Sequence, residues 1–106
     1  QNIAMEMALT GDTITAERAY QHGLVNILCE QGEAINEAIS LAERINSNAP
    51  LAVRATRKAV LEGAMVNDDE GIRIAVELFK PVAISEDAKE GPLAFVEKRS
   101  PEWKAR

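Results

Sequence analysis

Near the end of the chain, an aromatic side chain and two cations lie close together on a helix that is predicted to begin at Ser85. On a helical wheel Phe95 falls within about 60° of Lys98 and Arg99. A flat ring can stack on a nucleobase and a fixed cation can pair with a phosphate, so this pattern is typical of a nucleotide contact. The residue types leave an alternative open, in which Phe95 fills a gap in a helix interface while the cations are solvated.

The other residues with reactive side chains form no catalytic pattern. Glu6, Glu17 and Glu62 are typical of glutamates that face solvent from a helix. His22 stands alone near a predicted helix end, where a cation complements the helix dipole. Cys29 follows an apolar run and is interpreted as a small buried side chain rather than a nucleophile. No catalytic residue is assigned from these patterns.

The sequence also predicts no metal site and no phosphate-binding loop. The run NDDE at residues 67–70 lacks the spaced oxygen ligands of a calcium loop and favours a helix start. Gly63 and Gly71 are too isolated to form a phosphate-binding loop. Cys29 is the only cysteine, which excludes an internal disulfide and a cysteine-based zinc cluster.

Start and stop signals predict a mainly α fold of about five helices and one short strand. Residues 1–8 have the pattern of the last turns of a helix without a start signal. Thr15 can cap a two-turn helix that Gly23 ends. Residues 24–29, LVNILC, form the one run with strand character.

Two further helices are predicted in the middle of the chain. From Glu33 to Asn46 the apolar residues fall within about 160° of the helical wheel, which indicates an amphipathic helix. Pro50 begins a helix that Gly63 ends, with small residues on one side. The other side carries three cations, which are typical of solvated helix charges, although contact with phosphates or with a partner's acids stays open: Arg54, Arg57 and Lys58.

The next helix begins at residues 67–70, where Asn67 or Asp68 can act as the cap. Pro81 lies inside its pattern and predicts a kink or an early end. The predicted inner face of this helix consists of Ile72, Ala75, Val76, Phe79 and Val82.

The last helix is predicted from Ser85 to about Arg99. Pro92 predicts either a bend or a restart at that residue. In both cases Leu93 and Val96 are expected on the inward face, whereas Phe95 points elsewhere.

Length and composition indicate one soluble unit over residues 1–106. The chain has 106 residues, of which 46% are hydrophobic and 4% aromatic, so Ala, Ile, Leu and Val must build a modest core. The net charge of −5 argues against nucleic acid or an anionic membrane as the main partner. The apolar runs are short and residues 1–7 lack a signal pattern, so we expect no membrane span, no export and a cytoplasmic location.

Three segments, in this order, resemble the crotonase, or enoyl-CoA hydratase/isomerase, superfamily. They are AMEMALTGDTITAERAYQHGLVN at residues 4–26, LAERINSNAPLAVRATRKAV at residues 41–60 and SEDAKEGPLAFVEKRSPEWK at residues 85–104. Residues 41–60 are similar to a helix pair of the family, and residues 85–104 resemble its carboxyl-terminal signature. The resemblance therefore implies the carboxyl-terminal helical region of the crotonase ββα-spiral fold, without the spiral core.

This resemblance implies acyl-CoA chemistry that the chain does not itself contain. Family members bind acyl-CoA thioesters and stabilise the thioester oxygen with two backbone N–H groups, and in the hydratases two glutamates add water across the 2,3 double bond. That apparatus belongs to the family's amino-terminal part, so no catalytic residue is carried over. We expect the 106-residue chain alone to be inactive, with a coenzyme A thioester as the substrate of the full-length parent and no cofactor.

The resemblance also implies an assembly role and a coenzyme contact. The family's carboxyl-terminal helices build trimers, usually doubled into hexamers, and wall the CoA site. Phe95 and Lys98 match the aromatic and the lysine that reach the adenine and 3′-phosphate of CoA, commonly in the neighbouring subunit, and Arg99 matches less clearly. The alternative is a stand-alone, non-catalytic helical assembly module derived from a crotonase.

Overall fold

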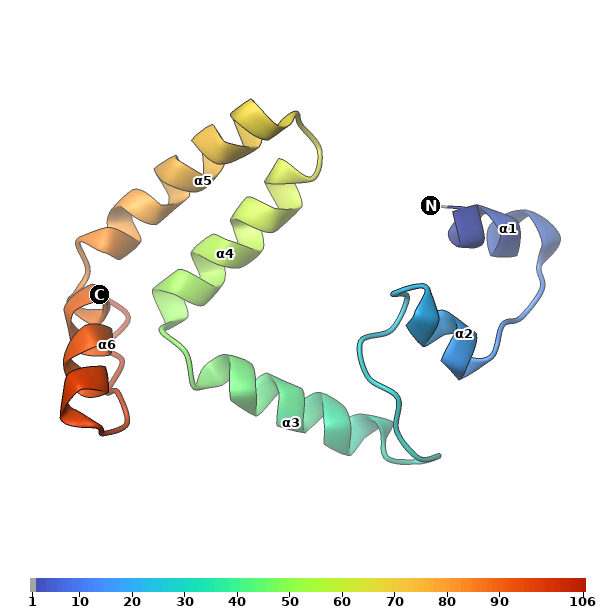
Figure 1. Cartoon of the computed structure of the whole chain (residues 1–106), viewed down its shortest axis with the longest axis horizontal. Helices are drawn as coiled ribbons and strands as arrows, with labels where there is room; N and C mark the ends of the chain where they lie inside the picture. Colours follow the sequence, from blue (N-terminus) through green and yellow to red (C-terminus); the bar gives the residue numbers. More distant parts are fainter. Residues whose placement is uncertain (1) are drawn as a thin grey trace. The chain divides into compact units, whose positions relative to one another are not determined.

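The computed structural model describes residues 2–106, and six helices make up most of this part of the chain (Figure 1). The helices are α1 (Asn2–Thr10), α2 (Ala16–Gln21), α3 (Ala34–Asn46), α4 (Pro50–Gly63), α5 (Asp68–Ala83) and α6 (Glu86–Glu97). The mainly α prediction is confirmed, with six helices where about five were expected.

The predicted strand at residues 24–29 is wrong. These residues form an irregular link between α2 and α3, and residues 2–106 contain no strand at all. A strand needs a neighbour that completes its backbone hydrogen bonds. The described residues offer no such neighbour, so an apolar run of the right composition does not form one.

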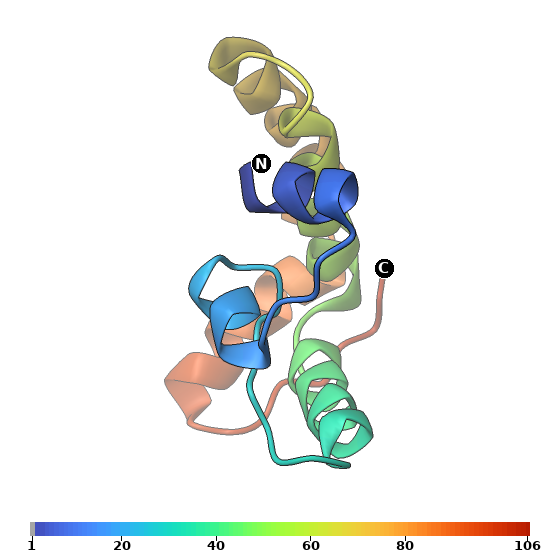
Figure 2. The ribbon, with the colours of Figure 1, turned by 90° about the vertical axis from the view of Figure 1, so that its right-hand side faces the viewer.

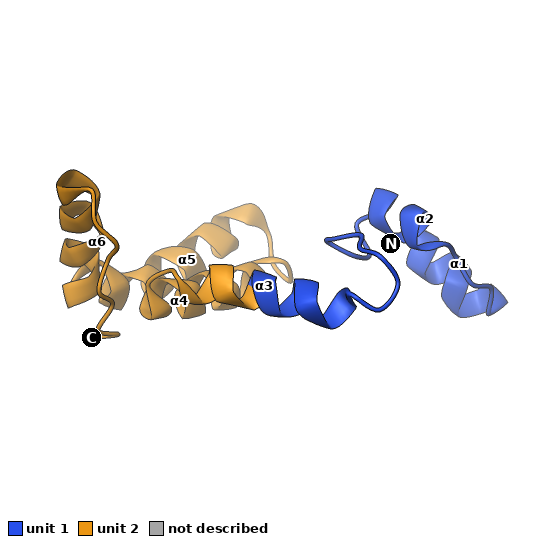
Figure 3. Ribbon diagram, turned by 90° about the horizontal axis from the view of Figure 1, so that it is seen from below, with its two compact units in different colours: residues 1–41 blue, residues 42–106 orange. Residues whose placement is uncertain are grey.

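The chain divides into two compact units, Gln1–Leu41 and Ala42–Arg106 (Figure 3). The boundary falls within α3. The expectation of a single unit over residues 1–106 stays a prediction, and each unit is described by itself below.

In the first unit, side chains fix the ends of α1 and α2. Thr10 Oγ1 donates to the carbonyl of Glu6 at 2.9 Å near the end of α1. Thr15 caps α2, because its Oγ1 accepts the Arg18 amide at 3.2 Å. Arg18 Nη2 also lies 3.3 Å from Glu6 Oε1, which links α2 to α1. Gly23 follows α2 with φ +69°, so the predicted cap and stop are both confirmed.

In the second unit, α4 and α5 form an antiparallel hairpin (Figures 1 and 2). Pro50 occupies the first turn of α4, and Asn67 Oδ1 caps α5 by accepting the Glu70 amide at 3.0 Å. The two helices approach closely where glycines meet, because a Cβ added to Gly71 would lie 3.6 Å from the Cα of Gly63. Small residues on both helices therefore permit this packing.

The predicted inner face of α5 is partly wrong. Ala75 and Val82 are half-buried as expected, but Ile72 and Val76 are 63% and 55% exposed, and Phe79 is also exposed. The half-buried row of α5 consists instead of Gly71, Ile74, Ala75, Leu78 and Val82. Because Gly71 contacts Gly63, this row of α5 faces α4, and a second apolar row of α5 stays exposed. We call this row, Ile72, Val76 and Phe79, the outer α5 row.

Neither internal proline ends its helix. Helix α5 continues through Pro81 to Ala83, so the predicted early end there is wrong. Helix α6 runs without interruption through Pro92, so the predicted restart is wrong as well. Proline removes one backbone donor but can be tolerated when the neighbouring turns keep their hydrogen bonds.

The predicted inward face of α6 is also wrong. Leu93 and Val96 are 49% and 76% exposed, whereas Ala94 and Asp87 are buried. The residues after the helix cause this difference, because they fold back along its other side. We call residues 99–106 the closing segment.

Candidate functional site

Ser85 is the N-cap of α6, as the sequence predicts, and the structure shows that it is buried. Ser85 Oγ accepts the Ala88 amide at 3.1 Å and donates to the carbonyl of Val82 at 2.7 Å. The side chain therefore caps α6 and ties its first turn to the end of α5.

The closing segment is bound to α6 through a buried carboxylate. Asp87 is 3% exposed, and its Oδ1 and Oδ2 accept the amides of Lys104 and Ala105 at 2.7 and 3.0 Å. The Glu86 amide donates to the carbonyl of Arg106 at 2.6 Å. Because both oxygens of Asp87 have partners, its burial is compensated by hydrogen bonds.

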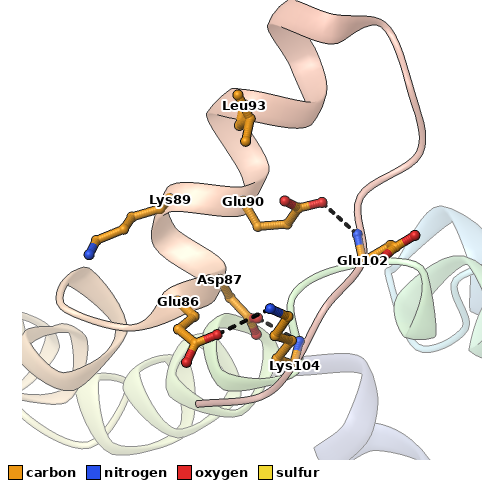
Figure 4. A pocket seen from close by; sticks show the side chains of 7 residues that line it. All are labelled: Glu86, Asp87, Lys89, Glu90, Leu93, Glu102 and Lys104. Atoms are coloured by element: carbon orange, nitrogen blue, oxygen red, sulfur yellow. Dashed lines mark hydrogen bonds and ion pairs between the residues drawn. The ribbon is translucent and has the colours of Figure 1, made fainter.

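One turn further along α6, a second carboxylate binds the same segment. Glu90 accepts hydrogen bonds from both terminal nitrogens of Arg99, at 2.5 and 3.0 Å. It also accepts the Glu102 amide at 2.8 Å (Figure 4). The Arg99 guanidinium, helped by the Glu102 N–H, lowers the pKa of Glu90 to about 2. The hydrogen bonds of Arg99 to Glu90 and to Glu97 raise the pKa of Arg99. This pair is therefore ionised throughout the neutral range.

An indole ring anchors the closing segment at its middle. Trp103 Nε1 donates to the carbonyl of Ser47, in the turn between α3 and α4, at 2.8 Å. A Cβ added to Gly91 would lie 3.3 Å from the ring, so the absence of a side chain at residue 91 lets the indole lie close to α6. The segment thus joins α6 to the start of α4 within the second unit.

The two residues that sequence analysis assigned to a nucleotide contact lie at the other end of α6. Phe95 is 84% exposed in the last turn. Lys98 follows the helix in the left-handed conformation, with φ 55° and ψ 40°, and its amide donates to the carbonyl of Phe95 at 3.3 Å. The Arg99 amide donates to the carbonyl of Ala94 at 3.1 Å, which completes a Schellman turn.

The third member of the predicted pattern has a different environment. The Arg99 guanidinium binds Glu90 and, through Nε, also Glu97 at 2.6 Å. Among residues 2–106 no ion pair involves Lys98. The alternative in which both cations are solvated is therefore wrong for Arg99, which binds two carboxylates.

A pocket of about 220 Å³ lies between α6 and the closing segment, and Phe95 and Lys98 do not line it. Its walls include Glu86, Glu90, Leu93 and Lys104, and Lys89 extends away from the closing segment (Figure 4). Asp87 and Glu90 were not predicted from the sequence as residues of the site. Their spacing of three residues on one helix face was visible, but their partners are backbone amides, which a sequence pattern does not mark.

The remaining candidates agree with the sequence except at one residue. His22 is the C-cap of α2, as its interpretation requires, and Asn67 caps α5 in the run NDDE. Cys29 is exposed, so its predicted burial is wrong. Within residues 2–106 no cluster of three possible metal-ligating side chains occurs, and no helix is long and apolar enough to cross a membrane.

Comparison with known proteins identifies the family. The profile of the enoyl-CoA hydratase/isomerase family matches residues 1–106. The chain belongs to this family. Among curated proteins, this family member is similar to an enoyl-CoA hydratase of Mycobacterium tuberculosis, with 38% identity over 98% of this chain and 39% of the relative. It is also similar to the carnitinyl-CoA dehydratase of Proteus mirabilis, with 39% identity over 98% of this chain and 41% of the relative.

Solved structures agree with this assignment. A crystal structure of an enoyl-CoA hydratase from M. tuberculosis matches with 48% identity and a TM-score of 0.93, over 99% of this chain and 42% of that protein. An enoyl-CoA hydratase from Bacillus anthracis matches with 34% identity and a TM-score of 0.93, over all of this chain and 41% of that protein. The chain thus spans about two fifths of the length of these curated relatives.

Proposed function

We propose that this chain is the carboxyl-terminal helical part of an acyl-CoA enzyme, in which Phe95 and Lys98 contact the adenine and the 3′-phosphate of coenzyme A. Family membership supports the substrate class. The exposed ring of Phe95 and the ammonium of Lys98, which has no ion-pair partner among residues 2–106, support the nucleotide contact. Stacking and charge pairing are the two interactions that such a ligand needs.

In this proposal the chemistry belongs to the remainder of the full-length protein. Hydration of 2,3-enoyl-CoA thioesters, or a related isomerisation, needs an oxyanion hole and a pair of carboxylates. We assign none of these to residues 1–106, and the reaction needs no cofactor beyond the CoA thioester. We also propose that the full-length protein is a cytoplasmic homo-oligomer, a trimer or a hexamer, and that neither nucleic acid nor a membrane is its partner.

The coenzyme contact is tested by calorimetry on the full-length protein with CoA and with 3′-dephospho-CoA. Lys98→Ala should weaken CoA binding about tenfold and leave 3′-dephospho-CoA unchanged, because it removes one charge-assisted contact to the phosphate. Phe95→Ala should weaken both ligands about tenfold through lost stacking. Lys89→Ala, an exposed lysine on the same helix, is the matched control. Unchanged CoA affinity in both site variants would reject the assignment.

The outer α5 row favours a second candidate, a stand-alone helical assembly module without enzymatic work. Ile72 and Val76 are exposed apolar side chains, and exposed apolar surface is typical of a contact with another protein chain. A 2,3-enoyl-CoA hydration assay on a homogeneous 106-residue chain bears on both candidates. We expect no turnover, and turnover by a preparation whose intact mass is correct would contradict the proposal that the chain is catalytically incomplete.

A further inference from the structure

Lys98 has a backbone conformation that lysine rarely adopts. Its φ of 55° and ψ of 40° lie in the left-handed region, where helices usually place glycine. For a residue with a Cβ this conformation costs about 1–2 kcal/mol. A strained conformation persists where the surrounding structure over-determines it, and such positions cluster at functional sites.

The surroundings that hold this turn centre on Glu90. Its Oε1 accepts both Arg99 Nη1 and the Glu102 amide, and its Oε2 accepts Arg99 Nη2. Arg99 directly follows Lys98, and its own amide is fixed to the carbonyl of Ala94. The residue before Lys98 belongs to α6, so Lys98 lies between a helix and a residue that Glu90 fixes.

Glu90 also determines which cation is available to a ligand. The Arg99 side chain is 37% exposed and is engaged by Glu90 and Glu97. A guanidinium that already binds two carboxylates binds a phosphate less well. Of the two cations that follow α6, Lys98 is therefore the one without a carboxylate partner among residues 2–106.

We propose that Glu90 is a positioning residue for the coenzyme contact. By binding Arg99 and the Glu102 amide at once, it holds the turn that presents Lys98 to the 3′-phosphate. This inference rests on the proposed function and deepens it, since Glu90 acts through Lys98 and does not touch the ligand.

The test is the ratio of the 3′-dephospho-CoA and CoA dissociation constants, measured by calorimetry on the full-length protein. Glu90→Gln keeps an acceptor for the Glu102 amide but removes the charge that holds Arg99. We expect the ratio to fall about threefold or more, within the coupling range of contacting residues. In a Lys98→Ala background the same substitution should not lower the ratio further, because the residue through which Glu90 acts is gone.

A matched control separates positioning from general stability. Glu70 also accepts two hydrogen bonds from one guanidinium, from Nε and Nη2 of Arg73 at 2.8 and 2.5 Å, and lies on α5, far from Lys98 in sequence. Glu70→Gln should leave the ratio unchanged. If Glu90→Gln does not fold, Arg99→Lys is measured instead, with the same ratio as the readout. Lysine keeps the positive charge but offers Glu90 one donor nitrogen in place of two.

The outcomes distinguish this inference from the proposed function. A ratio that Glu90→Gln leaves unchanged, or lowers equally with and without Lys98, overturns the positioning role. A ratio that Lys98→Ala itself leaves unchanged overturns the 3′-phosphate contact and the proposed role of Lys98 with it. A fall in the ratio that disappears in the Lys98→Ala background supports both.

Discussion

At the scale of single residues, the end of α6 combines strain and exposure in Lys98. The left-handed turn is one that glycine would make with less strain, and the side chain that glycine lacks has no ion-pair partner among residues 2–106. A second residue with a Cβ, Ala105, also has positive φ, at 58°, but lies in the closing segment with its amide bound to Asp87. The two residues therefore share a backbone strain and differ in the proposed contact with a ligand.

This difference leads to a prediction about Lys98→Gly. The substitution should raise the free energy of unfolding by about 0.5–1 kcal/mol, because glycine adopts the left-handed conformation without a clash. It should also weaken CoA binding, since the ammonium is lost. Urea denaturation and calorimetry on the full-length protein measure the two effects. Ala105→Gly is the control, which should gain stability without losing CoA affinity, and a Lys98→Gly protein with full CoA affinity would contradict the assigned role.

The carboxylate of Glu90 predicts a dependence of stability on pH. Its pKa is about 2 in the folded chain, where Arg99 holds it ionised, against about 4.3 for an unfolded glutamate. A lowered pKa stabilises the fold above the unfolded value, and this contribution is lost as the pH falls from about 4.5 towards 2. The urea midpoint of unfolding should therefore differ between the unsubstituted protein and Glu90→Gln at pH 6, and the two midpoints should converge towards pH 2. A difference that stays constant over this range would show that the ion pair does not contribute.

At the scale of helices, the α4–α5 hairpin shows what the sequence could and could not predict. Caps and stops are local, so Thr15, Gly23 and Ser85 are predicted correctly from the residue and its neighbours, and Asn67 is one of the two caps predicted for α5. The buried face of α5 depends on which row meets α4, and the glycine contact that decides this is not local. The same limit applies to α6, whose buried face follows from the closing segment.

The glycine contact itself can be tested by substitution at Gly71. An added Cβ would lie 3.6 Å from the Cα of Gly63, an ordinary van der Waals distance, and alanine favours a helix over glycine. Gly71→Ala should therefore stabilise the protein by about 0.5–1 kcal/mol. Gly71→Leu should destabilise it by about 1–3 kcal/mol, because atoms beyond Cβ must enter the α4–α5 contact. Thermal denaturation measures both, and a Gly71→Leu variant as stable as the parent would contradict this packing.

At the scale of the whole chain, the candidate site was predicted only in part. Phe95 and Lys98, which stay a prediction, could be proposed from the sequence because the residue types and the family signature coincide in one segment. Glu90 and Asp87 could not, since their roles depend on amides of a segment that returns from 12 to 18 residues away. Long-range contacts of this kind arise from tertiary packing rather than from helical periodicity.

Apolar faces that remain exposed predict self-association of the isolated 106-residue chain. Among the described residues, Ala55 and Ala94 are the buried apolar ones, whereas Ile72 and Val76 of the outer α5 row are more than half exposed. A contiguous apolar surface of this kind is typical of a protein–protein contact. Light scattering after size-exclusion chromatography should give a mass above that of one chain, and Ile72→Glu with Val76→Lys should shift it towards the monomer.

Arg57→Glu, a charge change on an exposed position of α4, is the control and should leave the mass unchanged. If the unsubstituted 106-residue chain is monomeric at high concentration, the outer α5 row does not drive assembly. The proposal of a stand-alone helical assembly module would then have no supporting observation.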